Sequence, residues 1–418
     1  MKSQVKRLHC FVIPDQSGDC TANFHGRDAR DRMKTAISRR STIEPFHAMD
    51  VLAEANRLRA QGAPIISMAV GQPSDPAPRA VREAAARAAA DGRIGYTDSL
   101  GMPALREAIA AHYADHYGVA VEPSRVVATT GSSAAFNLAF LAMFDAGERV
   151  AITAPGYPAY RNILKVLGLE AVEIDLAGAG WLTADRLEDA HARSPFQGLL
   201  FASPANPTGS ITPDDEIGRI LAACSRLGVQ VISDEIYHRL AYERPDRTAL
   251  ALDPDVVVIN SFSKYYCMTG WRIGWMVLPQ ALLRPVERIQ QSLYISAPEI
   301  SQIAAVPAFA ATAELEAVKA RYAQSRSMLL ERLPRLGLVL ASPMDGGFYA
   351  YCDVSRFTND SMDFARRMIA GAHVAATPGV DFDPVNGHRT MRFSYAGAPA
   401  DMAAAMDRLE AWLPGQKA

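Results

Sequence analysis

From about residue 75 onward, the chain alternates between segments with helical spacing of apolar residues and short runs that are almost entirely apolar. Segments such as 79–90 and 102–117 combine good helix formers with apolar residues three or four positions apart. Strands that are apolar throughout and separated by helices are typical of a sheet buried on both faces. The pattern therefore predicts an α/β domain with a mostly parallel, helix-covered sheet. The apolar runs are 126–128, 150–152, 199–201, 229–232 and 256–259.

A different pattern follows the α/β segment. One long helical stretch is expected from about residue 298 to 332. Beyond it, strand-like pieces at 348–351 and 392–395 mix with helical pieces at 363–370 and 400–412. This mixture predicts a smaller α+β domain.

The two patterns divide the chain into four parts. Residues 1–32 have no clear periodicity, and we expect a disordered extension there. Residues 33–74 are expected to form an N-terminal arm and part of the small domain, residues 75–298 the large domain, and residues 299–418 a connecting helix and the rest of the small domain.

Composition narrows the class of protein. Of the 418 residues, 49% are hydrophobic and 21% are charged, which is typical of a globular protein and excludes a fibrous or disordered one. The formal net charge of 43 − 45 = −2 gives no support for a nucleic-acid or membrane partner. The five cysteines are odd in number and form no C-x-x-C pair, so neither a disulfide framework nor a zinc site is indicated, and we expect a cytoplasmic protein. The uncharged stretch 126–144 is long enough for a membrane span, but its polar residues favour a strand, a turn and a helix.

Polar residues follow the ends of the predicted strands, where ligands bind in sheets of this kind. After the strand at 126–129, Ser132 and Ser133 open a helix whose free N–H groups and dipole suit a phosphate. The alternative is an ordinary serine N-cap. The glycine fingerprints of a dinucleotide-binding loop and of a P-loop are both missing from the sequence.

Three more strand ends carry candidate chemistry. Asn206 lies between two prolines that fix the backbone and aim its amide, although this segment taken alone is better explained as a rigid turn. Asp234 follows an apolar strand and can either cap a helix or pair with a buried cation. Lys264 follows the next strand and is flanked by aromatic residues. A lysine is usually solvated surface charge, but desolvation would lower its pKa and make it a nucleophile.

Together with Arg272, these residues place a phosphate cradle, an amide, a buried acid and an amine at one edge of one sheet. That is the set needed to hold pyridoxal 5′-phosphate (PLP): the lysine forms a Schiff base, the acid pairs with the pyridine nitrogen, and the helix start takes the phosphate.

The same motifs resemble those of the class I and II aminotransferases, fold-type I PLP enzymes of the aspartate aminotransferase superfamily. The resemblance covers about residues 41–415 and is carried by Asn-Pro-Thr-Gly at 206–209, Ser-Asp-Glu-Ile-Tyr at 233–237, and the segment 261–275 with Ser-Phe-Ser-Lys and Thr-Gly-Trp-Arg. It implies that Lys264 is the Schiff-base lysine and proton shuttle and that Asp234 pairs with the pyridine nitrogen. It also implies that Asn206 and Tyr237 bond the ring oxygen and that Tyr157 stacks on the ring. The phosphate contacts that it implies are Ser132, Ser133, Ser261, Ser263 and Arg272.

The resemblance also assigns substrate and subunit contacts. Arg392 aligns with the arginine that clamps the substrate carboxylate, for which a planar fork is suited. Gly71 resembles the backbone position that approaches the same carboxylate, together with Asn206; the residue after it is Gln72, where the family usually has an acid. Tyr96 resembles the tyrosine that reaches the phosphate of the neighbouring subunit, which implies a homodimer.

The implied reaction is ping-pong transfer of an amino group from an L-amino acid to a 2-oxo acid. Many dicarboxylate-specific members use a second arginine, and the corresponding stretch 292–298 has none, which favours neutral or aromatic donors but leaves aspartate open. A C–S lyase would need the same cofactor residues and remains an alternative. A transcription regulator on this fold is disfavoured, since residues 1–40 are too short for a DNA-binding unit.

Overall fold

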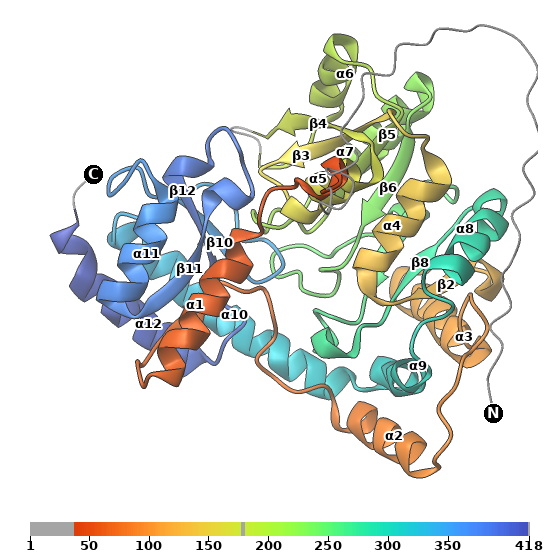
Figure 1. Ribbon diagram of the computed structural model, residues 1–418, viewed down its shortest axis with the longest axis horizontal. Coiled ribbons are helices and arrows are strands. Elements are labelled where there is room, and N and C mark those ends of the chain that lie inside the picture. The colour runs from red at the N-terminus through yellow and green to blue at the C-terminus, as the bar shows by residue number, and fades with distance from the viewer. Residues whose placement is uncertain (1–36, 177–179, 417–418) are drawn as a thin grey trace, which may run out of the picture.

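The computed structural model describes residues 37–176 and 180–416, which form two domains that each surround a sheet (Figure 1). The prediction of a disordered extension at 1–32 therefore falls outside the described residues, as do Cys10 and Cys20. The described cysteines, Cys224, Cys267 and Cys352, are all free and buried.

The large domain contains a seven-stranded sheet in the order β2-β8-β7-β6-β5-β3-β4. The central strands pair in parallel, and only β8 runs antiparallel to its neighbours β2 and β7. The prediction of a mostly parallel sheet is confirmed. The strands are β2 (Val126–Thr129), β3 (Arg149–Ala154), β4 (Glu170–Asp175), β5 (Gly198–Ala202), β6 (Gln230–Asp234), β7 (Val257–Ser261) and β8 (Gly274–Val277).

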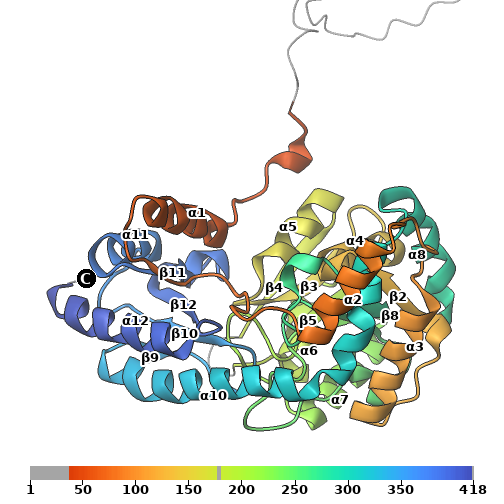
Figure 2. The same cartoon turned by 90° about the horizontal axis from the view of Figure 1, so that it is seen from below.

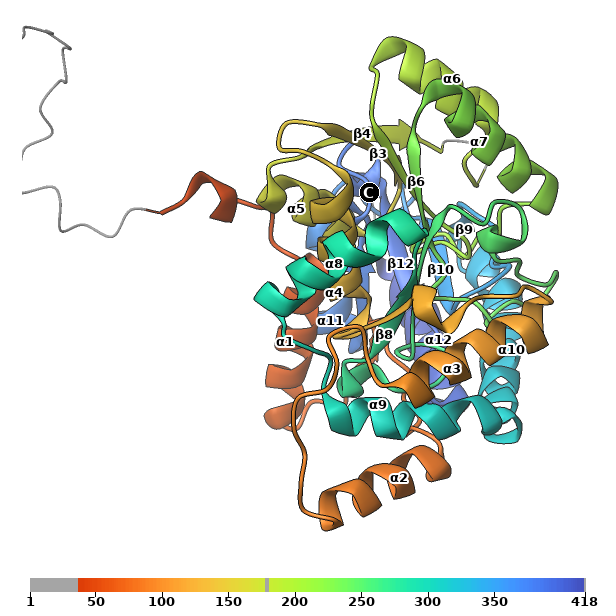
Figure 3. The same cartoon turned by 90° about the vertical axis from the view of Figure 1, so that its right-hand side faces the viewer.

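Helices bury both faces of this sheet, as the continuous apolar runs require. In β7, Val257 and Ile259 belong to the core under α4, α5 and α8, whereas Val258 belongs to the core under α3, α6 and α7. The two sets of helices lie on opposite sides of the strands (Figure 3). The helices are α2 (Arg79–Ala90), α3 (Pro103–His112), α4 (Gly131–Met143), α5 (Pro158–Leu167), α6 (Ala184–Arg193), α7 (Asp214–Leu227) and α8 (Gln280–Leu293).

The small domain joins both ends of the chain in one five-stranded sheet of order β1-β11-β12-β10-β9. The N-terminal strand β1 (Ile66–Met68) pairs in parallel with β11 (Val374–Pro378), about 300 residues later in the sequence. This confirms a second α+β domain built from N- and C-terminal segments; the domain boundaries given above stay a prediction. The other elements are β9 (Val339–Leu340), β10 (Tyr349–Asp353), β12 (Thr390–Ser394), α1 (His47–Ala60), α11 (Ser361–Ala372) and α12 (Pro399–Trp412).

Two predicted helices differ from the observed ones. The stretch 298–332 is broken into α9 (Glu299–Ala305), a 3-10 turn at Val306–Ala310 and α10 (Thr312–Arg335). Pro307 lies in the break, where it can donate no backbone hydrogen bond and its ring crowds the preceding turn. The α10 helix then runs from the large domain to the small one (Figure 2). Similarly, α3 ends at His112 and continues as a π-helical turn at Tyr113–Tyr117, which Gly118 closes in the left-handed conformation.

Among the described residues, no helix is both long and apolar enough to cross a bilayer. The uncharged stretch 126–144 is β2, a turn and α4, as the polar residues within it predict.

Candidate active site

A cavity of about 220 Å³ lies where the carboxyl ends of the large-domain strands meet the small domain. Asn206 follows β5, Asp234 ends β6 and Lys264 follows β7, so three neighbouring strands present one chemical group each. The small domain contributes Gly71, after β1, and Arg392, on β12.

The cavity brings together all but two of the residues that the sequence singled out. Its walls include Gly71, Ser132, Ser133, Tyr157, Asn206, Asp234, Tyr237, Ser263, Lys264, Arg272 and Arg392. Ser261 lies behind the wall, where its hydroxyl donates to the Ser263 hydroxyl at 2.9 Å and accepts from the Ser263 N–H at 3.1 Å. Tyr96 lies elsewhere on the surface and is 82% exposed.

The Lys264 amine is held inside the cavity by the small domain. Its Nζ donates to the carbonyl oxygen of Gly71 at 2.6 Å. Burial lowers the pKa of Lys264 to about 8, and the positive charge of Arg392 adds to this effect while Asp234 opposes it. A substantial fraction of the amine is therefore neutral near pH 8, which is the form that acts as a nucleophile or base.

Asp234 is a buried carboxyl with two hydrogen bonds. It accepts from the Ile236 N–H at 3.0 Å and from the Tyr160 hydroxyl, and it is 2% exposed. Burial raises the pKa of Asp234 to about 6, although both hydrogen bonds work in the opposite direction. Asp234 is therefore an anion at neutral pH and can pair with a cationic group placed in the cavity.

The start of α4 forms an anion cradle with Arg272. The helix begins at Gly131, and its N-cap, Thr130, makes no side-chain capping bond, so the serines lie in the first turn and neither is the N-cap. Gly131 has φ +74°, and a Cβ atom there would lie 3.0 Å from Cζ of Arg272 and closer still to Nη2. The guanidinium thus packs directly against the helix start, and the first-turn N–H groups and a fixed cation converge on one point. The residues fit a phosphate.

Arg392 is buried between two aromatic rings, with its Cζ 4.3 Å from the ring centre of Tyr349 and 4.6 Å from that of Phe382. Its Nη1 donates to Oδ1 of Asn206 at 2.8 Å, and its Nη2 donates to the Ala69 carbonyl oxygen at 2.5 Å and to the Thr377 hydroxyl at 3.2 Å. Its Nε has no hydrogen-bond partner among the described residues. The guanidinium is therefore oriented by its neighbours and keeps donor capacity for an anion.

Two tyrosines in the walls were missed by the sequence analysis. Tyr160 lies in the first turn of α5, three residues after the N-cap Tyr157, and the two ring centres are 5.3 Å apart, so its closeness to Tyr157 in the sequence was the available signal. Tyr349 could not be assigned to the cavity from the sequence, because its position depends on how β10 packs in the small domain. Its hydroxyl bonds that of Tyr237 at 2.7 Å, and its ring fills the space that a Cβ of Gly71 would need, 2.6 Å from Cζ.

The start of α1 also lines the cavity, although the sequence did not assign it to the site. Asp381 accepts the N–H groups of His47 at 2.9 Å and of Ala48 at 2.7 Å, which fixes the start of the helix. Phe46 and Met49 then line the cavity with apolar surface.

Comparisons with known proteins agree with this geometry. The family "Aminotransferase class I and II" matches residues 63–409. The chain belongs to this family. The valine–pyruvate aminotransferase of Mycobacterium tuberculosis is 46% identical over 92% of this chain and 100% of that protein. The aspartate/prephenate aminotransferase of Thermus thermophilus is 33% identical over 89% of this chain and 97% of that protein.

Solved aminotransferase structures share the fold. An aminotransferase from Mycobacterium tuberculosis superposes with a TM-score of 0.88 at 46% identity, covering 92% of this chain and 100% of that one. An aspartate aminotransferase from Thermus thermophilus with maleate gives 0.85 at 31% identity, covering 90% of this chain and 100% of that one. The chain is thus an aminotransferase of fold type I, a family whose members generally depend on PLP.

Proposed function

We propose that this aminotransferase binds PLP in the cavity and moves an amino group from a neutral L-amino acid to a 2-oxo acid by a ping-pong mechanism. The observation that carries the proposal is the placement of the Lys264 amine, the Asp234 carboxylate and the Gly131–Arg272 cradle around one cavity. These groups match an aldehyde, a pyridine nitrogen and a phosphate. When bound, PLP supplies an electron sink for the bond that breaks at the substrate Cα.

The residues around the cofactor have separate tasks in this proposal. Asp234, as an anion, pairs with the ring nitrogen and keeps it protonated. Asn206 and Tyr237 hold the ring oxygen, and Tyr157 covers one ring face. The first turn of α4, with Ser132, Ser133 and Arg272, binds the phosphate, and Ser263 lies in the same wall while Ser261 orients it.

The reaction itself needs a base that can also act as an acid. Lys264 is the residue that would hold the cofactor aldehyde. Its amine, when neutral, would accept the Cα proton of the substrate and, once protonated, would be able to give that proton up again, which a pKa near 8 allows in both directions. Arg392 binds the substrate carboxylate, so the Cα–H bond is held in a fixed orientation throughout.

A neutral donor is favoured by the walls that remain. Among the described wall residues, the cations are Lys264, Arg272 and Arg392, each of which already has a partner in the scheme. The part of the wall at the start of α1 is apolar, with Phe46 at the N-cap and Met49 in the first turn. The similarity to a valine–pyruvate aminotransferase supports this reading, whereas the aspartate/prephenate relative keeps a dicarboxylic donor as the alternative.

We also propose that the enzyme works as a homodimer in which Tyr96 completes the neighbouring site. Tyr96 is accompanied by Ile94 and Ile295, which are 44% and 46% exposed. The segment that contains Tyr96 is held against the segment that contains Ile295, because the Thr97 N–H donates a hydrogen bond to the Ser296 hydroxyl at 3.3 Å. Exposed apolar side chains gathered on a loop that is held in place are typical of a protein–protein interface.

One titration tests the function. Single amino acids are added to the PLP-loaded enzyme without an oxo acid, while the visible spectrum and the 2-oxo acid formed are followed. We expect the visible band to disappear with one equivalent of oxo acid per site, and the active donors to be neutral. Lys264→Ala should fold, lack the band and lose turnover. Lys165→Ala should behave as wild type, because Lys165 is exposed on α5 and does not line the cavity. Continuous release of pyruvate and ammonia would instead identify a C–S lyase, and a turnover-competent Lys264→Ala enzyme would refute the mechanism.

A further inference from the structure

The two domains meet inside the cavity through a pair of tyrosine hydroxyls. Tyr237 comes from the loop after β6 in the large domain and Tyr349 from β10 in the small domain, and both line the cavity. Their hydroxyl oxygens are 2.7 Å apart, and in the described part of the chain neither hydroxyl has another hydrogen-bond partner. Each hydroxyl carries one proton, so the bond between them uses one proton and leaves the other free.

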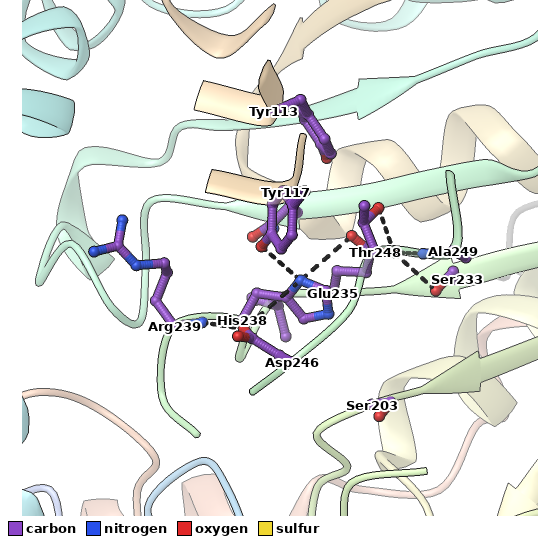
Figure 4. A network of polar contacts seen from close by, with 12 residues as sticks. Tyr113, Tyr117, Ser203, Ser233, Glu235, His238, Arg239, Asp246, Thr248 and Ala249 are labelled. Atoms are coloured by element: carbon purple, nitrogen blue, oxygen red, sulfur yellow. Dashed lines mark hydrogen bonds and ion pairs between the residues drawn. The ribbon is translucent and has the colours of Figure 1, made fainter. Parts of the chain in front are cut away.

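The backbone on either side of Tyr237 is fixed by polar contacts behind the cavity (Figure 4). Two residues earlier, the Glu235 carboxylate accepts from the Ala249 N–H at 2.8 Å. Two residues later, the N–H of Arg239 donates to the carboxylate of Asp246. The base of the Tyr237 side chain therefore has little freedom, and the orientation of its hydroxyl depends on the group at the tip of the ring, which is Tyr349.

Tyr349 is held by two neighbours. Gly71 has no side chain, and a Cβ there would collide with the Tyr349 hydroxyl, so only glycine lets this hydroxyl reach Tyr237. The guanidinium of Arg392 faces the ring, with Cζ 4.3 Å from the ring centre. Burial raises the pKa of the Tyr349 hydroxyl, and the positive charge of Arg392 works against this rise. A phenol beside a cation gives up its proton more readily, which makes Tyr349 a good hydrogen-bond donor.

We propose that Tyr349 is a positioning residue: its hydroxyl donates to the oxygen of Tyr237, which leaves the proton of Tyr237 to be donated to the ring oxygen of the cofactor. The inference rests on the proposed function, in which Asn206 and Tyr237 hold that oxygen. If the bond ran in the other direction, the only proton of Tyr237 would be directed to Tyr349 and the ring oxygen would lose a donor. A hydroxyl that accepts a hydrogen bond is also a stronger donor, because bonds in a chain polarise one another. Tyr349 thus acts on the cofactor through Tyr237.

Removal of one oxygen atom tests this direction. Tyr349→Phe keeps the ring that faces Arg392 and lacks only the hydroxyl. The readout is the pH midpoint of the visible absorbance of the PLP-loaded enzyme without substrate, which reports the proton bound beside the ring oxygen. A hydrogen bond donated to that oxygen weakens its hold on the proton, so Tyr349→Phe should raise the midpoint by about half a pH unit. Tyr237→Phe removes the donor itself and should raise the midpoint further.

A double variant shows whether Tyr349 acts through Tyr237. In the Tyr237→Phe background, Tyr349→Phe should cause no additional shift, because the connection to the ring oxygen is already lost. Tyr351→Phe is the matched control. Tyr351 lies two residues further along β10 and is buried, but its hydroxyl bonds that of Thr390 at 2.6 Å and it does not line the cavity. This variant loses a comparable bond and should keep the wild-type midpoint.

The outcomes are distinct. An unmoved midpoint in Tyr349→Phe overturns the proposal, and so does a lowered one, since Tyr349 would then be withholding the Tyr237 proton from the ring oxygen. A rise that Tyr351→Phe shares, or that persists in the Tyr237→Phe background, also overturns it. The ratio of kcat/KM for an amino acid to that for the matching amine without a carboxylate should stay at the wild-type value in Tyr349→Phe; a fall would show that the hydroxyl acts through Arg392 instead.

Failure of the proposed function would look different. A wild-type enzyme without a Lys264-dependent visible band would refute that function itself. A normal band together with an unmoved midpoint in Tyr349→Phe would refute only the role of Tyr349.

Discussion

The anion cradle at the start of α4 can be tested by adding one carbon atom. In Gly131→Ala, the new Cβ would lie 3.0 Å from Cζ of Arg272 and closer to Nη2, so the guanidinium has to move. The backbone at φ +74° is also unfavourable for alanine, by about 1–2 kcal/mol. Loss of a hydrogen bond between the displaced guanidinium and a phosphate would cost a further ~1.5–3 kcal/mol. This second cost corresponds to a loss of cofactor affinity of about 10- to 150-fold.

A second glycine separates the two costs. Gly118 has φ +68°, and a Cβ there would meet no atom within 4 Å, so Gly118→Ala carries the backbone strain without the collision. Thermal unfolding of the cofactor-free proteins should therefore show similar losses of stability in both variants. The dissociation constant of PLP, measured by absorbance, should increase only in Gly131→Ala. An unchanged constant in Gly131→Ala would refute the assignment of this helix start as the phosphate site.

Three more substitutions test neighbouring features. Tyr160→Phe removes a hydrogen bond that lowers the pKa of Asp234, so the pKa of Asp234 should rise. The acidic limb of the pH profile of kcat/KM should then move up by about one pH unit; an unmoved limb would show that the bond does not influence the reaction. Asp381→Asn leaves one N–H of the first turn of α1 without an acceptor, and hydrogen exchange of that turn should become about tenfold faster or more while the core exchanges as before. Arg392→Lys loses the planar fork, so kcat/KM for amino acids should fall about 100-fold with PLP affinity unchanged; an equal fall for an amine without a carboxylate would contradict carboxylate binding.

The sequence predicts those parts of the fold and site that depend on local pattern. Apolar runs mark the strands of the large sheet, and residues directly after them, such as Asn206, Asp234 and Lys264, meet because parallel strands end at one edge. Pro307 is a local signal for the break in the helix at Val306–Ala310. The helical periodicity on both sides of this proline nevertheless predicts one continuous helix.

Features that depend on docking between distant segments could not be predicted in this way. Tyr349 reaches Gly71 only because β10 and β1 belong to the same sheet. The turn that follows β7 decides whether Ser261 or Ser263 faces the cavity, and the shape of this turn cannot be predicted from the spacing of apolar residues. The contribution of Tyr96 to a second site depends on a partner subunit and stays a prediction.

The sheet that joins both chain ends has a consequence for how such an enzyme can diversify. In the proposed function, the groups that one subunit contributes to its own cofactor site lie between Gly131 and Arg272, whereas Gly71 and Arg392, which would meet the substrate carboxylate, come from segments outside that stretch. Substitutions near either end of the gene can therefore reshape what is accepted as donor while the cofactor remains bound. Conversely, a fragment that ends before β12 would retain the residues between Gly131 and Arg272 and lose Arg392.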